Sequence, residues 1–255
     1  MKPINWIMVH FSPTGTTKKV ACAIASGLGE GVSEMDLCKE NCLTAPDDST
    51  GILVVMPVYA GRVPGVALER LTRIQGNGQP AVAVVVYGNR EFDDALLELK
   101  NTLEHIGFQV AAAGAFIAEH SIVRSIAAGR PDETDLNIAR QFGMDIMEKL
   151  ENENASIPVQ VSGNFPYIEA KPSAFHPKAD EEKCIRCGTC AAMCPAAAIP
   201  DENPDRTLDS KCITCMRCVQ VCPVNARALP AAFIAGAAKM LTEKAAGYKS
   251  PQLYL

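Results

Sequence analysis

The first 150 residues alternate between short apolar runs and longer segments with helical composition. Apolar runs, which are typical of strands buried in a parallel sheet, predict strands over residues 4–11, 51–56, 79–87 and 108–118, with a shorter strand near 32–37. Helices are predicted between and after them, at about residues 20–28, 65–74, 92–106 and 132–150. This alternation predicts an α/β fold with a doubly wound parallel five-stranded sheet.

The pattern changes after residue 150, where the helical period disappears. Prolines 158, 166, 172 and 177 punctuate the next segment, which predicts a linker. Its aromatic residues Phe165, Tyr167 and Phe175 are unlike a flexible Gly/Ser tether, so we expect an ordered linker along the surface. We divide the chain into an α/β domain (1–150), this linker (151–180), a small domain (181–228), and a C-terminal helix and tail (229–255). The helix is expected over about 231–244 and could pack against either domain.

The small domain carries one cysteine pattern written twice. Residues 184–195 and 212–223 share the spacing C-x2-C-x2-C-x3-C-P, offset by 28 residues at every cysteine. Two alternatives are a pair of four-cysteine zinc sites and a disulfide framework. Zinc sites usually come as separated C-x2-C pairs, and disulfides need an oxidising compartment. The spacing therefore favours iron–sulfur clusters.

This run resembles the bacterial two-cluster ferredoxins. The resemblance implies a small α+β domain with two [4Fe-4S] clusters, in which the fourth cysteine of each copy ligates the cluster of the other copy. One cluster would then be held by Cys184, Cys187, Cys190 and Cys222, and the second by Cys212, Cys215, Cys218 and Cys194.

A hydroxyl-rich loop connects the first predicted strand to the first helix. Free backbone N–H groups and the helix dipole favour an anion at such a place, although the same residue types also form ordinary turns. Neither the Walker pattern nor G-x-G-x-x-G is present. The loop resembles the flavodoxin phosphate loop [ST]-x-T-G-x-T, which implies that it binds the 5′-phosphate of FMN. The candidate residues are Ser12, Thr14, Gly15, Thr16 and Thr17.

Two further glycine-bearing loops follow the third and fourth strands. Ligands of doubly wound sheets bind outside the carboxyl ends of the strands, so the three loops should meet. These two resemble the isoalloxazine-binding loops of the flavodoxin superfamily, which implies flavin contacts from Val58, Tyr59, Ala60, Gly61, Tyr87, Gly88, Asn89 and Arg90. The resemblance also makes the Ala60–Gly61 peptide the candidate to face the flavin N5. Aromatic faces suit a flat ring, but either tyrosine could instead pack in the core at a strand end.

Two arginines lie in these loops, where acidic residues are usual in flavodoxins. A cation beside the flavin N1/O2 edge would favour the anionic reduced form, so Arg62 and Arg90 suggest that the two-electron state is easily reached. The alternative is that both arginines face solvent or pair with carboxylates.

The remaining cysteines and histidines match no motif. Cys22, Cys38 and Cys42 are expected to be buried thiols that behave as small hydrophobic residues. Of the four histidines, only His120 follows the fifth strand and so falls at the expected ligand edge.

Charge and composition exclude several classes of partner. The net charge of −5 gives no electrostatic footprint for nucleic acid or an anionic membrane. The apolar start lacks a cleavage site, and the apolar stretch over residues 228–241 is too short to span a bilayer. We expect a cytoplasmic protein without a nucleic-acid or membrane partner, and the oligomeric state stays open.

Taken together, the chain resembles the ferredoxin-fused flavodoxin-like proteins of anaerobic bacteria and archaea. The flavodoxin resemblance covers residues 1–150 and the ferredoxin resemblance residues 181–228. It implies electron transfer between FMN and two [4Fe-4S] clusters, in a soluble carrier or reductase component that serves a redox partner protein. One alternative is a flavin-dependent reductase of a small molecule, such as a quinone or nitro compound, fed by the clusters. Another is a docking module without flavin. No nicotinamide fingerprint is visible.

Overall fold

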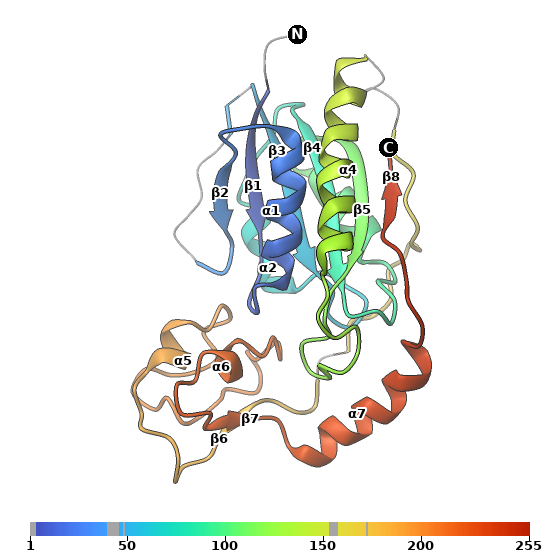
Figure 1. Cartoon of the computed structure of the whole chain (residues 1–255). Helices are drawn as coiled ribbons and strands as arrows, with labels where there is room; N and C mark the ends of the chain where they lie inside the picture. The colour runs from blue at the N-terminus through green and yellow to red at the C-terminus, as the bar shows by residue number, and fades with distance from the viewer. Residues whose placement is uncertain (1–3, 40–45, 48, 153–157, 172) are drawn as a thin grey trace.

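The structure is a computed structural model that describes residues 4–39, 46–47, 49–152, 158–171 and 173–255. Figure 1 shows an α/β domain with a small cysteine-rich domain below it, and a long helix that leads the chain back up to the sheet. None of the described helices combines the length and apolar composition needed to cross a bilayer.

The sheet has six strands, of which five are parallel. These five follow the order β2-β1-β3-β4-β5, which is the order of flavodoxin-like doubly wound sheets. They are β1 (Asn5–His10), β2 (Ser33–Asp36), β3 (Thr50–Pro57), β4 (Pro80–Tyr87) and β5 (Gln109–Ile117). The predicted fold and its five parallel strands are confirmed. The sixth strand, β8 (Gln252–Tyr254), pairs antiparallel with β5 and was not predicted, because three residues are too short to show a strand period.

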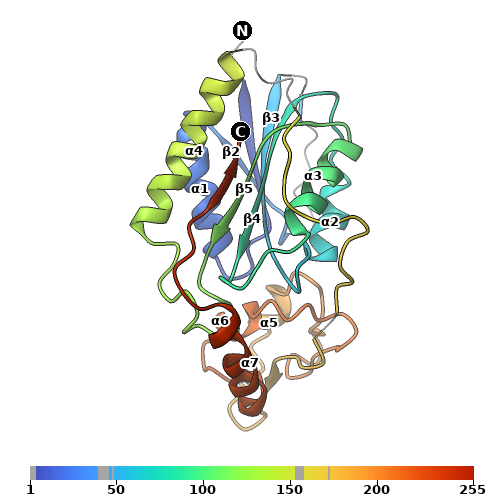
Figure 2. The same cartoon turned by 90° about the vertical axis from the view of Figure 1, so that its right-hand side faces the viewer.

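Helices cover both faces of the sheet, as Figures 1 and 2 show. One face carries α1 (Thr16–Leu28) and α4 (Glu133–Glu151), and the other carries α2 (Gly65–Leu71) and α3 (Ala95–His105). Successive residues of a strand point to opposite faces. Accordingly Val82 and Val84 pack under α1 and α4, whereas Ala83 and Val85 pack under α2 and α3.

The cysteine-rich domain keeps the repeat of its sequence in its backbone. Short helices α5 (Thr189–Ala192) and α6 (Arg217–Gln220) occupy equivalent places, and β6 (Lys178–Ala179) pairs with β7 (Arg227–Ala228). Positive φ angles recur at the 28-residue offset, in the pairs Arg186/Thr214, Gly188/Met216 and Ala197/Asn225. Helix α7 (Ala231–Lys244) follows and leads towards β8.

The linker is fastened to the side of the α/β domain. The carboxylate of Asp94, at the start of α3, accepts hydrogen bonds from the backbone N–H groups of Asn164 and Ile168. The Asn101 side chain donates to the Tyr167 hydroxyl at 2.8 Å. The chain therefore reaches the cysteine-rich domain along a defined path over α3.

Helices α1 and α4 pack so closely that glycine is required where they cross. A Cβ atom on Gly143 would lie 2.2 Å from the carbonyl oxygen of Ile24 and 2.8 Å from the Cα atom of Gly27. These are backbone atoms, which cannot move aside without shifting a helix. We predict that Gly143→Ala lowers the free energy of unfolding by about 1–3 kcal/mol, as overpacking does, although alanine is the better helix former.

Gly236 in α7 is the matched control, because no atom lies within 4 Å of the position of its Cβ. Gly236→Ala should leave stability unchanged or raise it by up to about 1 kcal/mol. Urea unfolding followed by circular dichroism measures both variants. Equal effects of the two substitutions would contradict the close crossing.

Candidate functional site

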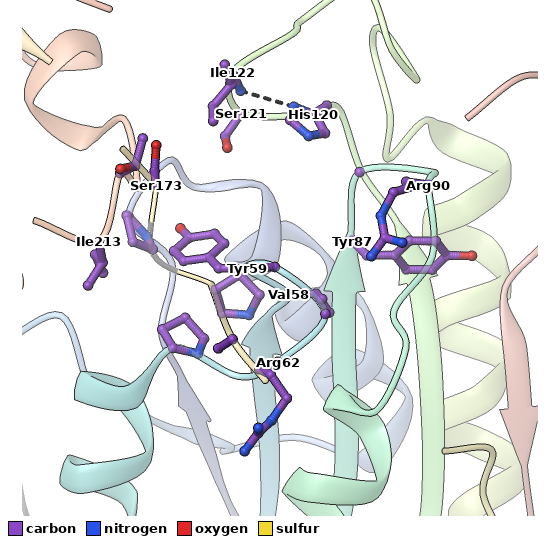
Figure 3. Close-up of a pocket in the computed structure, with 18 of the residues that line it drawn as sticks. Val58, Tyr59, Arg62, Tyr87, Arg90, His120, Ser121, Ile122, Ser173 and Ile213 are labelled. Carbon is purple, nitrogen blue, oxygen red and sulfur yellow. Dashed lines mark hydrogen bonds between the residues drawn. The ribbon is translucent and has the colours of Figure 1, made fainter. Parts of the chain in front are cut away.

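A cavity of about 860 Å³ opens at the carboxyl ends of the parallel strands. This volume is typical of sites for cofactors and small molecules. All three predicted loops contribute to its lining, and Figure 3 shows residues of the second and third loops at the cavity. The predicted residues that line it are Thr14, Thr16, Thr17, Val58, Tyr59, Ala60, Gly61, Tyr87, Gly88 and Arg90. Of the other three candidates, Ser12 and Gly15 shape the first loop, and Asn89 holds the C-terminal segment.

The first loop leaves the N-terminus of α1 open towards the cavity. Gly15 precedes the helix in the left-handed conformation (φ 88°) and supplies no side-chain cap. The buried Ser12 hydroxyl oxygen accepts a hydrogen bond from the backbone N–H of Lys18 at 2.9 Å, which folds the loop back on the helix. The earlier N–H groups of the first turn have no partner within the helix, and Thr16 and Thr17 line the cavity. This arrangement suits an anionic group.

The second loop is a tight turn with Ala60 and Gly61 at its tip. Tyr59 and Arg62 exchange two backbone hydrogen bonds of 2.9 and 3.1 Å, and both tip residues have positive φ angles of 52° and 80°. A Cβ on Gly61 would lie 2.5 Å from Oδ2 of Asp93, so conformation and space both require glycine there. The turn presents the Ala60–Gly61 peptide at the cavity wall.

The two tyrosines differ in position. Figure 3 shows Tyr59 towards the middle of the cavity, with the Tyr87 ring turned away from it. Tyr87 is only 4% exposed and packs edge-to-face on Phe92, with ring centroids 5.5 Å apart. Burial raises the pKa of Tyr87 to about 12 and that of Tyr59 well above its usual value. The Tyr87 ring therefore packs in the core, whereas Tyr59 has a face available to a planar ligand.

Neither loop arginine offers an unpaired charge to the cavity. The Arg62 side chain donates to Glu98 at 2.9 Å and to the backbone oxygen of Ile168 at 2.8 Å, and Figure 3 shows it pointing away from Tyr59. Arg90 forms an ion pair with Asp93. Pairing with carboxylates was one of the two alternatives for these residues. That alternative is confirmed for both arginines, and the easily reached two-electron state stays a prediction.

The third loop is tied to the C-terminal segment. The buried Asn89 side chain donates to the backbone oxygens of Ala245 (2.7 Å) and Gly247 (3.0 Å). This role keeps the amide away from the cavity, which Asn89 does not line. The sequence of the loop could not predict this role of Asn89, because its partner Ala245 lies 156 residues away.

The cysteine-rich domain docks directly on the first loop. From α6, Arg217 donates to the backbone oxygen of Pro13 at 2.9 Å, and Gln220 donates to that of Thr14 at 3.2 Å. Arg70 of α2 donates in the other direction, to the backbone oxygen of Pro195 at 2.8 Å. As a result Cys212 and its neighbours Ile213 and Thr214 line the cavity beside the three loops.

The sulfur atoms of the second group lie together with Cys194. Burial raises the pKa of Cys215 to about 12 and that of Cys218 to about 11, and the nearby thiol of Cys194 adds to both shifts and to that of Cys212. The ferredoxin resemblance implied that Cys194 belongs with the second copy, and this assignment of ligands stays a prediction. A metal bound there would displace the thiol protons.

The cysteines form neither disulfides nor a single-ion site in the part of the chain that the structure describes. The ten cysteines among the described residues are all free thiols. No three histidine, cysteine, aspartate or glutamate side chains converge as ligands of one metal ion within the described ranges.

The other cysteines are only partly as expected. Cys38 is half-buried, and burial raises its pKa to about 12. Cys22 lies on α1 as predicted but is exposed, so the expectation of a buried thiol was wrong there. The sequence correctly predicted that Cys22 lies on a helix, but not that it lies on the exposed side of that helix. Cys42 lies outside the described residues.

Sequence reasoning missed part of the cavity wall. The linker contributes Phe175, and α7 contributes Phe233, Met240 and Leu241. His120, in the loop after β5, also lines the cavity, as its place at the ligand edge had suggested. The apolar side chains of α7 carried no signal, because an amphipathic helix does not reveal which neighbour it covers.

Comparison with known protein families identifies the cysteine-rich part of the chain. Residues 176–223 match the family described as the 4Fe-4S dicluster domain. No curated protein matches the chain. The match and the strand order fit a flavodoxin-like domain joined to a 4Fe-4S dicluster domain.

Several solved structures resemble the chain weakly. A flavodoxin from the domain Archaea is 20% identical, with a TM-score of 0.43, and the alignment covers 58% of this chain and 99% of that one. Oxidised flavodoxin 1 from Bacillus cereus is 17% identical, with a TM-score of 0.40, and the alignment covers 56% of this chain and 97% of that one. Rubredoxin oxygen:oxidoreductase from Desulfovibrio gigas is 17% identical, with a TM-score of 0.39, and the alignment covers 61% of this chain and 38% of that one. The fold assignment rests on the strand order itself.

The docking contact of Arg217 can be tested without any bound cofactor. Removing a charged hydrogen-bond donor costs about 1.5–3 kcal/mol, and each 1.4 kcal/mol is about tenfold in an equilibrium. We predict that Arg217→Met speeds hydrogen exchange of the backbone amides in residues 14–18 by about tenfold or more, measured by mass spectrometry.

Arg186→Met is the control, because this arginine lies on the same small domain but is exposed and pairs with Asp205. It should leave the exchange of residues 14–18 unchanged. Equal exchange in the wild type and both variants would show that the first loop does not depend on docking.

Proposed function

We propose that the chain is an electron-transfer protein in which FMN and two [4Fe-4S] clusters exchange electrons within one molecule. The observation that carries this proposal is the shared cavity: Cys212 lines the same space as the three loops expected to hold the flavin. A cluster on the second cysteine group would lie directly against the flavin site.

The residues of the sheet domain suit FMN. The open N-terminus of α1 can bind a phosphate, and Tyr59 can contact a planar ring. Gly61 and Gly88 line the same cavity as Tyr59. These features support FMN over a larger dinucleotide, for which no fingerprint is present.

The eight cysteines suit two clusters of different exposure. Cys187 of the first copy is exposed, whereas its repeat equivalent Cys215 is buried. The first cluster would therefore exchange electrons with a redox partner protein, and the second would pass them to or from the cavity. A flavin handles pairs of electrons and single ones, whereas each cluster handles one, so the bound groups would link two-electron and one-electron chemistry. A reducing cytoplasm suits these free thiols.

A second candidate function is reduction of a small molecule at the flavin. The cavity extends past the three loops to the apolar side chains of Phe175, Phe233, Met240 and Leu241. Such a wall could hold a flat apolar acceptor, such as a quinone, beside the flavin. Turnover of a soluble quinone by the purified protein, with dithionite-reduced clusters and no partner protein, would favour this function over that of a carrier.

The proposal is tested by anaerobic purification followed by analysis of flavin, iron and acid-labile sulfide. We expect one FMN and two four-iron clusters per chain. Zinc in place of iron and sulfide would overturn the cluster assignment. Absence of flavin, after addition of FMN to the purified chain, would leave the sheet domain as a docking module.

The crossed ligation predicts which cluster each fourth cysteine serves. Cys194→Ser should perturb the cluster of Cys212, Cys215 and Cys218, whose sulfur atoms lie near Cys194. Cys222→Ser should perturb the cluster of the first copy instead. Electron paramagnetic resonance of the reduced variants distinguishes the two, because only the second cluster borders the cavity and should respond to bound FMN.

Loss of the FMN-responsive signal in Cys222→Ser, with its retention in Cys194→Ser, would contradict the crossed assignment. Cys22→Ser is the control, since this exposed thiol belongs to neither group and should leave both signals intact.

A further inference from the structure

His120 stands at the cavity with one ring nitrogen already occupied. Its Nδ1 accepts hydrogen bonds from the backbone N–H groups of Ile122 (3.2 Å) and Val123 (3.1 Å). Figure 3 shows the imidazole beside the Ile122 loop, with one of these bonds drawn. The residue follows β5 and lines the same cavity as the three flavin-site loops.

These two contacts define the protonation of the ring. A nitrogen that accepts hydrogen bonds carries no proton, so the single proton of the neutral imidazole must lie on Nε2. Protonating Nδ1 would turn it into a donor facing two other donors. Burial, together with the nearby charge of Arg90, lowers the pKa of His120 and acts in the same direction. The ring is therefore neutral at neutral pH.

The remaining N–H group is free to serve a ligand. Nε2 of His120 has no hydrogen-bond partner among the described residues. The adjoining Cδ2 atom lies 2.5 Å from where a Cβ on Gly88 would be, so the ring rests directly on the loop after β4. Glycine at position 88 thus makes room for the imidazole beside the cavity.

The loop that carries His120 is well braced. The backbone N–H of His120 donates to the carbonyl oxygen of Ile126 at 3.1 Å, and the backbone N–H of Ile126 donates to the carbonyl oxygen of Val123 at 2.9 Å. Val123 and Ile126 pack on Leu241 and Ala245 at the end of α7. The direction of the Nε2–H group is consequently held by packing rather than by the ligand.

We propose that His120 is a neutral hydrogen-bond donor, through Nε2–H, to a conjugated ring carbonyl in this cavity. A ring carbonyl gains negative charge when the ring is reduced, so the donor stabilises the reduced ligand more than the oxidised one. A neutral imidazole does not release its remaining proton, so His120 polarises the carbonyl and transfers no proton itself. The inference rests on the proposed function, because that function supplies the reducible ring. Such a carbonyl belongs either to the flavin or to a small quinone bound beside it.

His120→Asn separates this role from a structural one. The side-chain oxygen of asparagine can take the place of Nδ1 and keep the two loop contacts, but no group then reaches the position of Nε2. The control is His105→Asn, because His105 is exposed on α3. Dissociation constants of oxidised and dithionite-reduced FMN are measured anaerobically for the wild type and for both variants.

If the carbonyl is that of the flavin, His120→Asn should bind oxidised FMN within about twofold of the wild type and reduced FMN about tenfold more weakly, as loss of one hydrogen bond to a charged group predicts. The two-electron potential would then fall by about 30 mV. If the carbonyl is that of a quinone, FMN binding is unchanged, and kcat for a soluble quinone falls about tenfold at an unchanged KM.

The inference fails if both forms of FMN and the quinone kinetics are unaffected, or if His120→Asn weakens both forms of FMN equally. A wild-type chain that binds no FMN refutes the proposed function, and the inference with it. The tautomer is tested separately by ¹⁵N NMR of the imidazole in the wild type, which should show the proton on Nε2 at neutral pH. A proton on Nδ1 would refute the inference alone and leave the proposed function standing.

Discussion

The contact between the cysteine-rich domain and the first loop orients the groups on which the ligand site depends. In a trans peptide the C=O of one residue and the N–H of the next point in opposite directions. The carbonyl of Pro13 points to Arg217 and that of Thr14 to Gln220. The N–H groups of Thr14 and Gly15 therefore point away from the small domain. A loop of this kind has no regular ladder of its own, so the donors from α6 give its peptides a defined direction.

The C-terminal segment fixes the opposite side of the cavity. Asn89 holds it through Ala245 and Gly247. Beyond that point, Arg130 donates to the backbone oxygen of Lys249 at 2.9 Å, and β8 then pairs with β5. The last part of the chain thus spans the loops after β4 and β5, including the one that carries His120. The cavity is therefore built from distant parts of the sequence, from the first loop to the end of α7.

Sequence patterns predicted what depends on local periodicity and missed what depends on distant contacts. The five parallel strands follow from runs such as residues 51–56, which are buried throughout. The meeting of the three loops follows from the rule for carboxyl ends of strands. The core position of the Tyr87 ring and the pairing of Arg62 with Glu98 could not be deduced, because each depends on a side chain from another element. Strand β8 depends on the free edge of β5, which no pattern in the tail reveals.

One further signal was present in the repeat, in the places where its two copies differ. The positions equivalent to Arg217 and Gln220 in the first copy are Thr189 and Ala192, neither of which can reach across an interface. Cluster ligation alone needs only the cysteines and the turns between them, so it would favour the same residues in both copies. Long polar side chains confined to α6 therefore indicate that this copy has a second task. The structure shows that task as docking on the first loop. The two copies also differ in exposure, since Cys187 is exposed and its equivalent Cys215 is buried.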